Sequence, residues 1–183
     1  MAKIVAKVYG DALFDLALEL KQLDQVEEEI KATKETLSEN DELLQFLNHP
    51  KISNEEKIAT IENIFKGRFS DTTVGFFVTV VTKGRYNELV TICDYFLDEV
   101  REYRKIGKAV VVSATTLSSE EKEKIENRLL QLTDYVKFQM DYQVDPSILG
   151  GLVIRIGDRV VDSSVKSKLE LMKKDLMKLQ LAN

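Results

Sequence analysis

The chain has 183 residues, of which 44% are hydrophobic and 31% are charged. This composition excludes a disordered chain, because disordered chains bury too little apolar surface to offset the entropy lost on folding. Acidic residues outnumber basic ones up to Lys105 and the two nearly balance after it, within a net charge of −5, so no concentrated basic face is expected to bind nucleic acid.

A first helix is predicted over residues 4–20, where apolar residues recur every three or four positions. Its expected core stripe is Val5, Val8, Ala12, Leu16 and Leu20. Asp24 is expected to cap a second helix. The acidic run 27–29 lies near the start of that helix, where carboxylates interact favourably with the helix dipole, and it is interpreted as a solvated face.

Four further helices are predicted before residue 105. They are expected at about residues 41–47, 53–65, 71–83 and 86–103. A capping box formed by Ser53 and Glu56 opens the helix at 53–65, because each side chain can satisfy a free backbone donor. Gly84 is expected to end the next one in a left-handed conformation. Six helices with short connections predict a compact bundle over residues 1–105.

The hydrophobic period changes from 3.6 to 2 after the bundle, which predicts β-structure. The β-branched run around Val111 is typical of a buried strand. Three more strands are expected at residues 136–143, 152–156 and 159–161. Gly157 and Asp158 are expected to form the two-residue hairpin turn between the last two strands.

Two helices are predicted to accompany these strands. A capping box of Ser118 and Glu121 opens the first, and the second begins near Val165. Residues 106–183 are therefore expected to form a small α/β domain, with a hinge at residues 104–107. The predicted fold class is α+β with two domains, a six-helix bundle followed by a mixed sheet with two helices.

No converging set of catalytic residues is found. The single histidine, His49, stands beside a proline in a predicted loop, and the single cysteine, Cys93, has no second cysteine to join it in a metal site. The sequence contains neither a phosphate-binding loop nor a nucleophile elbow, and Ser163 and Ser164 are interpreted as helix caps. We therefore expect no catalytic residue, cofactor or metal. No apolar run approaches the roughly 20 residues that span a bilayer.

Three segments carry motifs of one known family. Residues 145–169 contain an acidic residue, a glycine pair, alternating aliphatic residues, Arg, Gly-Asp and then Asp-Ser-Ser-Val. Residues 5–17 are similar to the opening Tyr-Ala-x-Ala-Leu-Phe-x-x-Ala, with Gly10 where alanine is usual. Together with the central Lys83-Gly84-Arg85, these segments resemble the δ subunit of bacterial F-type ATP synthases, the family of the mitochondrial oligomycin-sensitivity-conferring protein (OSCP).

The resemblance implies a non-catalytic stator component that links the F1 catalytic head to the peripheral b stalk and resists torque during proton-driven ATP synthesis. It implies that the bundle grips the N-terminal helix of an α subunit between its own first and fifth helices. The C-terminal domain would meet the C-terminal region of the b subunit. Association with the cytoplasmic face of the bacterial cell membrane would then be peripheral and indirect.

Candidate contact residues follow from placing these partners on the predicted helices. Those for the α-subunit helix are Val5, Tyr9, Asp11, Leu13, Leu16, Phe76, Phe77 and Val80, with Asp11 as a polar rim group. Those for the b stalk are Val165, Leu169, Met172 and Leu176. Two other functions remain open, an enzyme of small-molecule metabolism and a helical regulatory scaffold or adaptor outside ATP synthase. The apolar candidates on the first and fifth helices can also be explained simply as bundle core.

Overall fold

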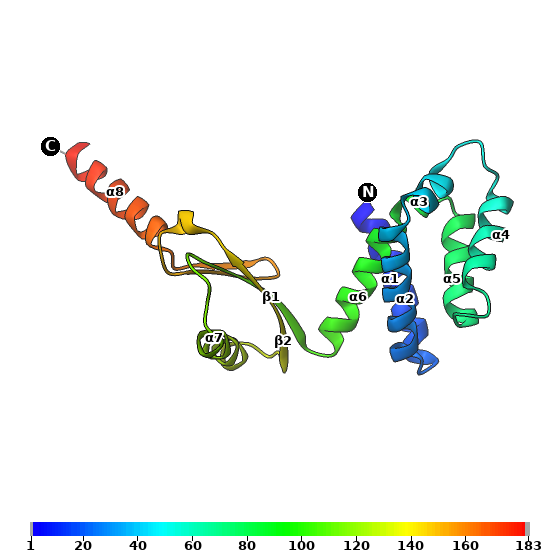
Figure 1. Ribbon diagram of the computed structural model, residues 1–183, viewed down its shortest axis with the longest axis horizontal. Helices are drawn as coiled ribbons and strands as arrows, with labels where there is room; N and C mark the ends of the chain where they lie inside the picture. Colours follow the sequence, from blue (N-terminus) through cyan, green and yellow to red (C-terminus); the bar gives the residue numbers. More distant parts are fainter. Residues whose placement is uncertain (1, 182–183) are drawn as a thin grey trace. The chain divides into compact units, whose positions relative to one another are not determined.

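The computed structural model describes residues 2–181, without the side chains of residues 2, 38, 41, 44 and 175–181. The chain divides into two units, Met1–Tyr103 and Arg104–Asn183, and Figure 1 traces both along the sequence. The expected fold class is confirmed, because a helical first part is followed by a four-stranded mixed sheet with helices.

The described part of the N-terminal unit contains six α-helices. They are α1 (Ala2–Glu19), α2 (Leu23–Glu39), α3 (Asp41–Asn48), α4 (Asn54–Phe65), α5 (Asp71–Thr82) and α6 (Leu89–Tyr103), with the short 3-10 helix η1 (Tyr86–Glu88) before α6. Helices α1 and α2 pack on α6, and α4 packs beside α5 (Figure 1). The predicted capping box is confirmed, because the Ser53 hydroxyl accepts from the Glu56 N–H and the Glu56 carboxylate accepts from the Ser53 N–H.

The core face of α1 is not the predicted stripe. Among its described residues, the buried ones are Ala6, Gly10, Leu13 and Ala17. The predicted stripe is largely outside, with Val8 61% exposed and Leu16 39% exposed. Helix α1 is apolar on most of its circumference, so spacing alone could not identify the inner face. The packing of α1 on α6 shows which face is the inner one. The ring of Tyr95 on α6 lies so close to Gly10 that a Cβ there would be 2.4 Å from its Cδ1 atom.

The start of α2 also differs from the prediction. The helix begins at Leu23, so Asp24 lies in its first turn and not at the cap. In the acidic run, Glu28 is exposed but Glu27 and Glu29 are buried. The expected solvated face is therefore wrong for these two carboxylates. Segments distant in the sequence cover this part of α2. The local pattern of charges does not predict that coverage.

The described part of the C-terminal unit contains four strands and two α-helices. Its elements are β1 (Ile106–Ser113), α7 (Ser119–Leu132), β2 (Lys137–Val144), the 3-10 helix η2 (Pro146–Ile148), β3 (Leu152–Ile156), β4 (Arg159–Asp162) and α8 (Val165–Leu181). The sheet order is β2-β1-β3-β4, with β1 parallel to β2 and antiparallel to β3. Gly157 adopts a φ of 54° in the β3–β4 turn, which confirms the predicted hairpin.

Helix α7 covers one face of the sheet. Its Leu129 packs with Ala109 and Phe138, and these three residues form a buried hydrophobic cluster. On the opposite face Val110 and Val112 remain half-buried. The prediction of a buried strand is therefore correct for one face of β1 and wrong for the other. A run of β-branched residues does not show how many faces of a strand are covered.

The connection between the units is shorter than the predicted hinge. Because β1 begins at Ile106, only Arg104 and Lys105 separate it from α6. We expect a fragment of residues 1–105 to unfold in urea as one cooperative transition, since the buried cluster around Phe77 and Phe96 is made only of residues before 105. Far-UV circular dichroism would measure this transition. A gradual loss of helix without a transition would contradict autonomous folding of the bundle.

Candidate functional site

Helices α1 and α5 meet through an aromatic pair. The ring centroids of Tyr9 and Phe76 lie 6.5 Å apart in an edge-on arrangement. Helix α1 packs mainly on α6, and α5 packs mainly on α4, so α1 and α5 are bridged by side chains at this point. The surface around the ring pair, called the α1/α5 surface below, consists of Val5, Val8, Tyr9, Ala12 and Leu16 of α1 with Thr72, Phe76 and Thr79 of α5.

The α1 side of this surface is apolar and open. Val8, Ala12 and Leu16 are exposed at four-residue spacing, and Ile4 extends the row by one turn with 70% exposure. Isolated exposed apolar residues are ordinary on soluble proteins. A row of four on one face of a helix is instead typical of a protein interaction surface.

The apolar residues among the predicted contacts for a partner helix divide into two groups. Val5, Tyr9 and Phe76 are half-buried on the α1/α5 surface, together with the exposed Leu16. Leu13, Phe77 and Val80 are buried, with exposures of at most 1%. A partner side chain does not reach these three residues in this conformation, and they form the core beneath the surface.

Asp11 has a different place from that predicted for a rim group. Its carboxylate accepts a hydrogen bond from the hydroxyl of Tyr95 on α6 at 3.0 Å. Burial and hydrogen bonds to Asp11 and Glu99 raise the pKa of the Tyr95 hydroxyl, so this group remains a donor. Residues two apart point to different sides of a helix, so Asp11 stabilises the α1–α6 contact while Tyr9 faces α5.

Sequence reasoning missed Ile4 and Val8 as exposed surface residues. Val8 was expected in the core stripe, and Ile4 was not among the candidate contacts. A usable signal was present in the row formed by Ala6, Gly10 and Ala17, because small residues allow another element to approach a helix closely. That row marks the inner side of α1, and the larger aliphatic residues opposite it are then left outside.

The b-stalk candidates lie on α8. Ser164 caps this helix, because its hydroxyl accepts from the Ser167 N–H at 3.2 Å, and the Val165 N–H donates to the Gly150 carbonyl at 3.0 Å. The apolar side chains of Val165, Leu169 and Met172 are exposed. The side chain of Leu176 lies outside the described residues. The first turn of α8 is thus anchored, and the apolar side that follows it is open over residues 165–174.

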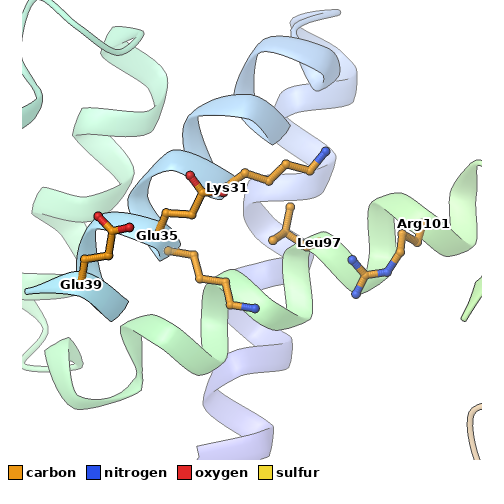
Figure 2. Close-up of a pocket in the computed structure, with 6 residues that line it drawn as sticks. Lys31, Glu35, Glu39, Leu97 and Arg101 are labelled. Carbon is orange, nitrogen blue, oxygen red and sulfur yellow. The ribbon is translucent and has the colours of Figure 1, made fainter. Parts of the chain in front are cut away.

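A depression of about 350 Å³ between α2 and α6 is lined by charged side chains (Figure 2). Its cations are already paired with carboxylates. Lys31 lies 2.5 Å from Glu27, Lys34 lies 2.5 Å from Asp94, and Arg101 pairs with Asp98. The depression therefore offers no uncompensated charge to a small anion.

Groups that could support chemistry do not converge elsewhere in the described part of the chain. Among the side chains that the structure describes, no three of His, Cys, Asp or Glu are placed to hold a metal ion. Burial, together with the Asp94 carboxylate, raises the pKa of the Cys93 thiol to about 12, so this thiol is unreactive at neutral pH. No helix among the described residues is long and apolar enough to cross a membrane.

Comparison with known proteins gives a consistent result. A family model described as ATP synthase delta (OSCP) subunit matches residues 5–176. The ATP synthase subunit delta of Lachnoclostridium phytofermentans is 61% identical over 181 residues, covering 99% of this chain and all of that protein. The corresponding subunit of Alkalihalophilus pseudofirmus is 39% identical, covering 94% of this chain and 95% of the relative.

A solved structure shares the fold. A chain in the cryo-EM structure of the Toxoplasma gondii mitochondrial ATP synthase hexamer aligns with a TM-score of 0.73 and 21% sequence identity. The alignment covers 94% of this chain and 97% of that chain. Both units of the present fold therefore recur together in another protein.

Proposed function

This chain belongs to the ATP synthase delta (OSCP) subunit family, and from that membership we propose that it is a stator component linking the F1 catalytic head to the peripheral b stalk. In this role it resists torque during proton-driven ATP synthesis. It acts as a peripheral protein at the cytoplasmic face of the bacterial membrane, held there through the complex. Family membership also argues against an adaptor outside ATP synthase.

The observation that carries the proposal is the α1/α5 surface. It presents an exposed apolar row on α1 beside the half-buried rings of Tyr9 and Phe76. An amphipathic helix can bury its apolar face on such a surface, with anchors spaced by three or four residues. We propose that the N-terminal helix of an α subunit occupies it. The exposed aliphatic residues would then be covered in the assembled enzyme.

The C-terminal unit supplies the second attachment in this proposal. The exposed apolar residues Val165, Leu169 and Met172 lie on one side of α8 at spacings of three and four, as a helix–helix contact requires. We propose that this side binds the C-terminal region of the b subunit. The subunit itself is then non-catalytic, and its work is to hold two partners at once without a cofactor.

The anchor residues give the test of this function. We expect Tyr9→Ala and Phe76→Ala each to weaken binding of a peptide from the α-subunit N-terminus by about tenfold or more, because central aromatic anchors carry most interface energy. Isothermal titration with the full chain would measure the affinity. Both rings are half-buried, so we expect the variants to remain folded with modestly lowered melting temperatures.

A control variant shows whether loss of any exposed apolar side chain lowers the affinity for the peptide. Leu132 at the end of α7 is 65% exposed and lies in the other unit. Leu132→Ala should bind the peptide as the wild type does. If the wild-type chain does not bind the peptide, or if both ring variants bind it unchanged, the α1/α5 surface is not the docking site.

A further inference from the structure

A carboxylate on α2 holds the beginning of α5. Glu29 Oε1 accepts the backbone N–H of Ser70 at 2.8 Å, and Glu29 Oε2 accepts the Ser70 hydroxyl at 2.7 Å. The two residues are 41 positions apart in the sequence. Ser70 is also the N-cap of α5, because its hydroxyl accepts from the Thr73 N–H at 3.3 Å. One side chain thus binds both hydrogen-bond donors of the residue that starts the helix.

The environment of Glu29 keeps this arrangement in place. The Gln25 amide donates to Glu29 Oε1 at 3.0 Å and orients the carboxylate from one helical turn earlier. Glu29 is buried. Burial opposes its ionisation, but hydrogen bonds from Thr73, Ser70 and Gln25 outweigh that effect and hold its pKa below the usual range. The group is therefore a charged double acceptor at neutral pH, and hydrogen bonds to such groups are stronger than neutral ones.

The contacts of α5 make its first turn important for the α1/α5 surface. A second tether lies beside the first, since the Thr72 hydroxyl donates to the Gln22 side-chain oxygen at 3.3 Å. Helix α5 otherwise packs mainly on α4, and it reaches α1 through the Tyr9–Phe76 ring pair. Phe76 follows Ser70 by less than two helical turns. A helix this short moves as a rigid rod, so a shift at Ser70 displaces Phe76.

We propose that Glu29 is a positioning residue for partner binding, which sets the separation of α1 and α5 by fixing the first turn of α5, although it does not itself touch the partner. This inference rests on the proposed function, because it assumes that a helix docks on the α1/α5 surface. The buried carboxylate of Glu29 would then help to set the affinity with which the chain binds the α-subunit helix of the F1 head. The apolar surface residues alone would not define that affinity.

Three variants of the full chain test the proposal. We expect Glu29→Ala to weaken binding of the α-subunit N-terminal peptide by about tenfold, within the range by which residues outside a site modulate binding. Glu29→Gln retains an acceptor for the Ser70 N–H and should restore most of the affinity. Glu28→Ala removes a neighbouring exposed carboxylate of the same helix and should bind as the wild type does. Titration calorimetry measures all three affinities.

Hydrogen exchange reports directly on the hydrogen bonds between Glu29 and Ser70. In Glu29→Ala the amides of Ser70 and Thr73 should exchange faster than in the wild type, while those of α6 stay protected. Faster exchange with unchanged peptide affinity would overturn the proposal. Failure of the wild-type chain to bind the peptide would instead refute the proposed function. If Glu29→Ala does not fold, Gln25→Ala removes only the orienting bond from an exposed residue, and unchanged affinity in that variant would overturn the proposal.

Discussion

Replacing Phe77 with alanine is expected to lower the free energy of unfolding of the N-terminal unit by about 3 to 5 kcal/mol, the usual range for truncating a buried aromatic side chain. Phe77 is 1% exposed, and its ring centroid lies 5.6 Å from that of Phe65 on α4 and 5.8 Å from that of Phe76. Its removal would open a cavity between α4 and α5. Urea denaturation followed by far-UV circular dichroism would measure the change.

Phe76 provides the comparison for this variant, because it is adjacent in sequence but half-buried. Phe76→Ala should cost about 1 to 2 kcal/mol of stability, since less apolar area returns to water. The two phenylalanines were both candidate contacts for a partner helix, and the structure separates their roles. A Phe77→Ala variant with unchanged stability but lost peptide binding would show that Phe77 is an anchor and not core.

Replacing Gly151 with alanine is expected to destabilise the C-terminal unit by about 3 kcal/mol or more, through backbone strain and overpacking together. Gly151 has a φ of 76°, and a Cβ there would lie 2.5 Å from the carbonyl oxygen of Ser163. That carbonyl cannot easily move, because the Ser163 N–H and hydroxyl donate to the Leu152 carbonyl at 2.9 and 2.8 Å. Hydrogen exchange of the backbone amides in β1 would measure the loss of stability of the C-terminal unit separately from the N-terminal unit.

Gly157 is the matched control for Gly151. It has a φ of 54°, but nothing lies within 4 Å of the position that a Cβ would take. Gly157→Ala should therefore carry only the conformational cost of about 1 kcal/mol. Equal losses for the two variants would show that the contact with Ser163 has no steric effect.

The candidate site was predictable in part. Tyr9 and Phe76 were assigned to one surface from the resemblance, and the structure places their rings side by side. Leu13 and Phe77 were grouped with them, because the apolar spacing of each helix is compatible with either face. Which apolar residues lie inside depends on the neighbouring helices, and no sequence window contains that information. The partner contacts themselves remain predictions.

The sequence by itself determined the order of the α-helices and strands, because the signals that define them are local. The Ser53 and Ser118 capping boxes, the left-handed Gly84 and the Gly157 turn depend on backbone groups within a few residues, and all four occur as expected. The change of hydrophobic period likewise separated the bundle from the sheet. Such signals can be recognised without the tertiary structure, since each motif satisfies the hydrogen bonds of backbone groups within its own segment.

Only the tertiary structure decided which face of α1 is buried and where the acidic run of α2 points. Gly10 faces inward because the ring of Tyr95 approaches it from α6, 85 residues later in the chain. Glu29 is buried because Ser70 brings two donors to it. The physical reason is common to both cases. The free energy of burying a side chain depends on the groups that replace water around it, and here those groups come from distant segments.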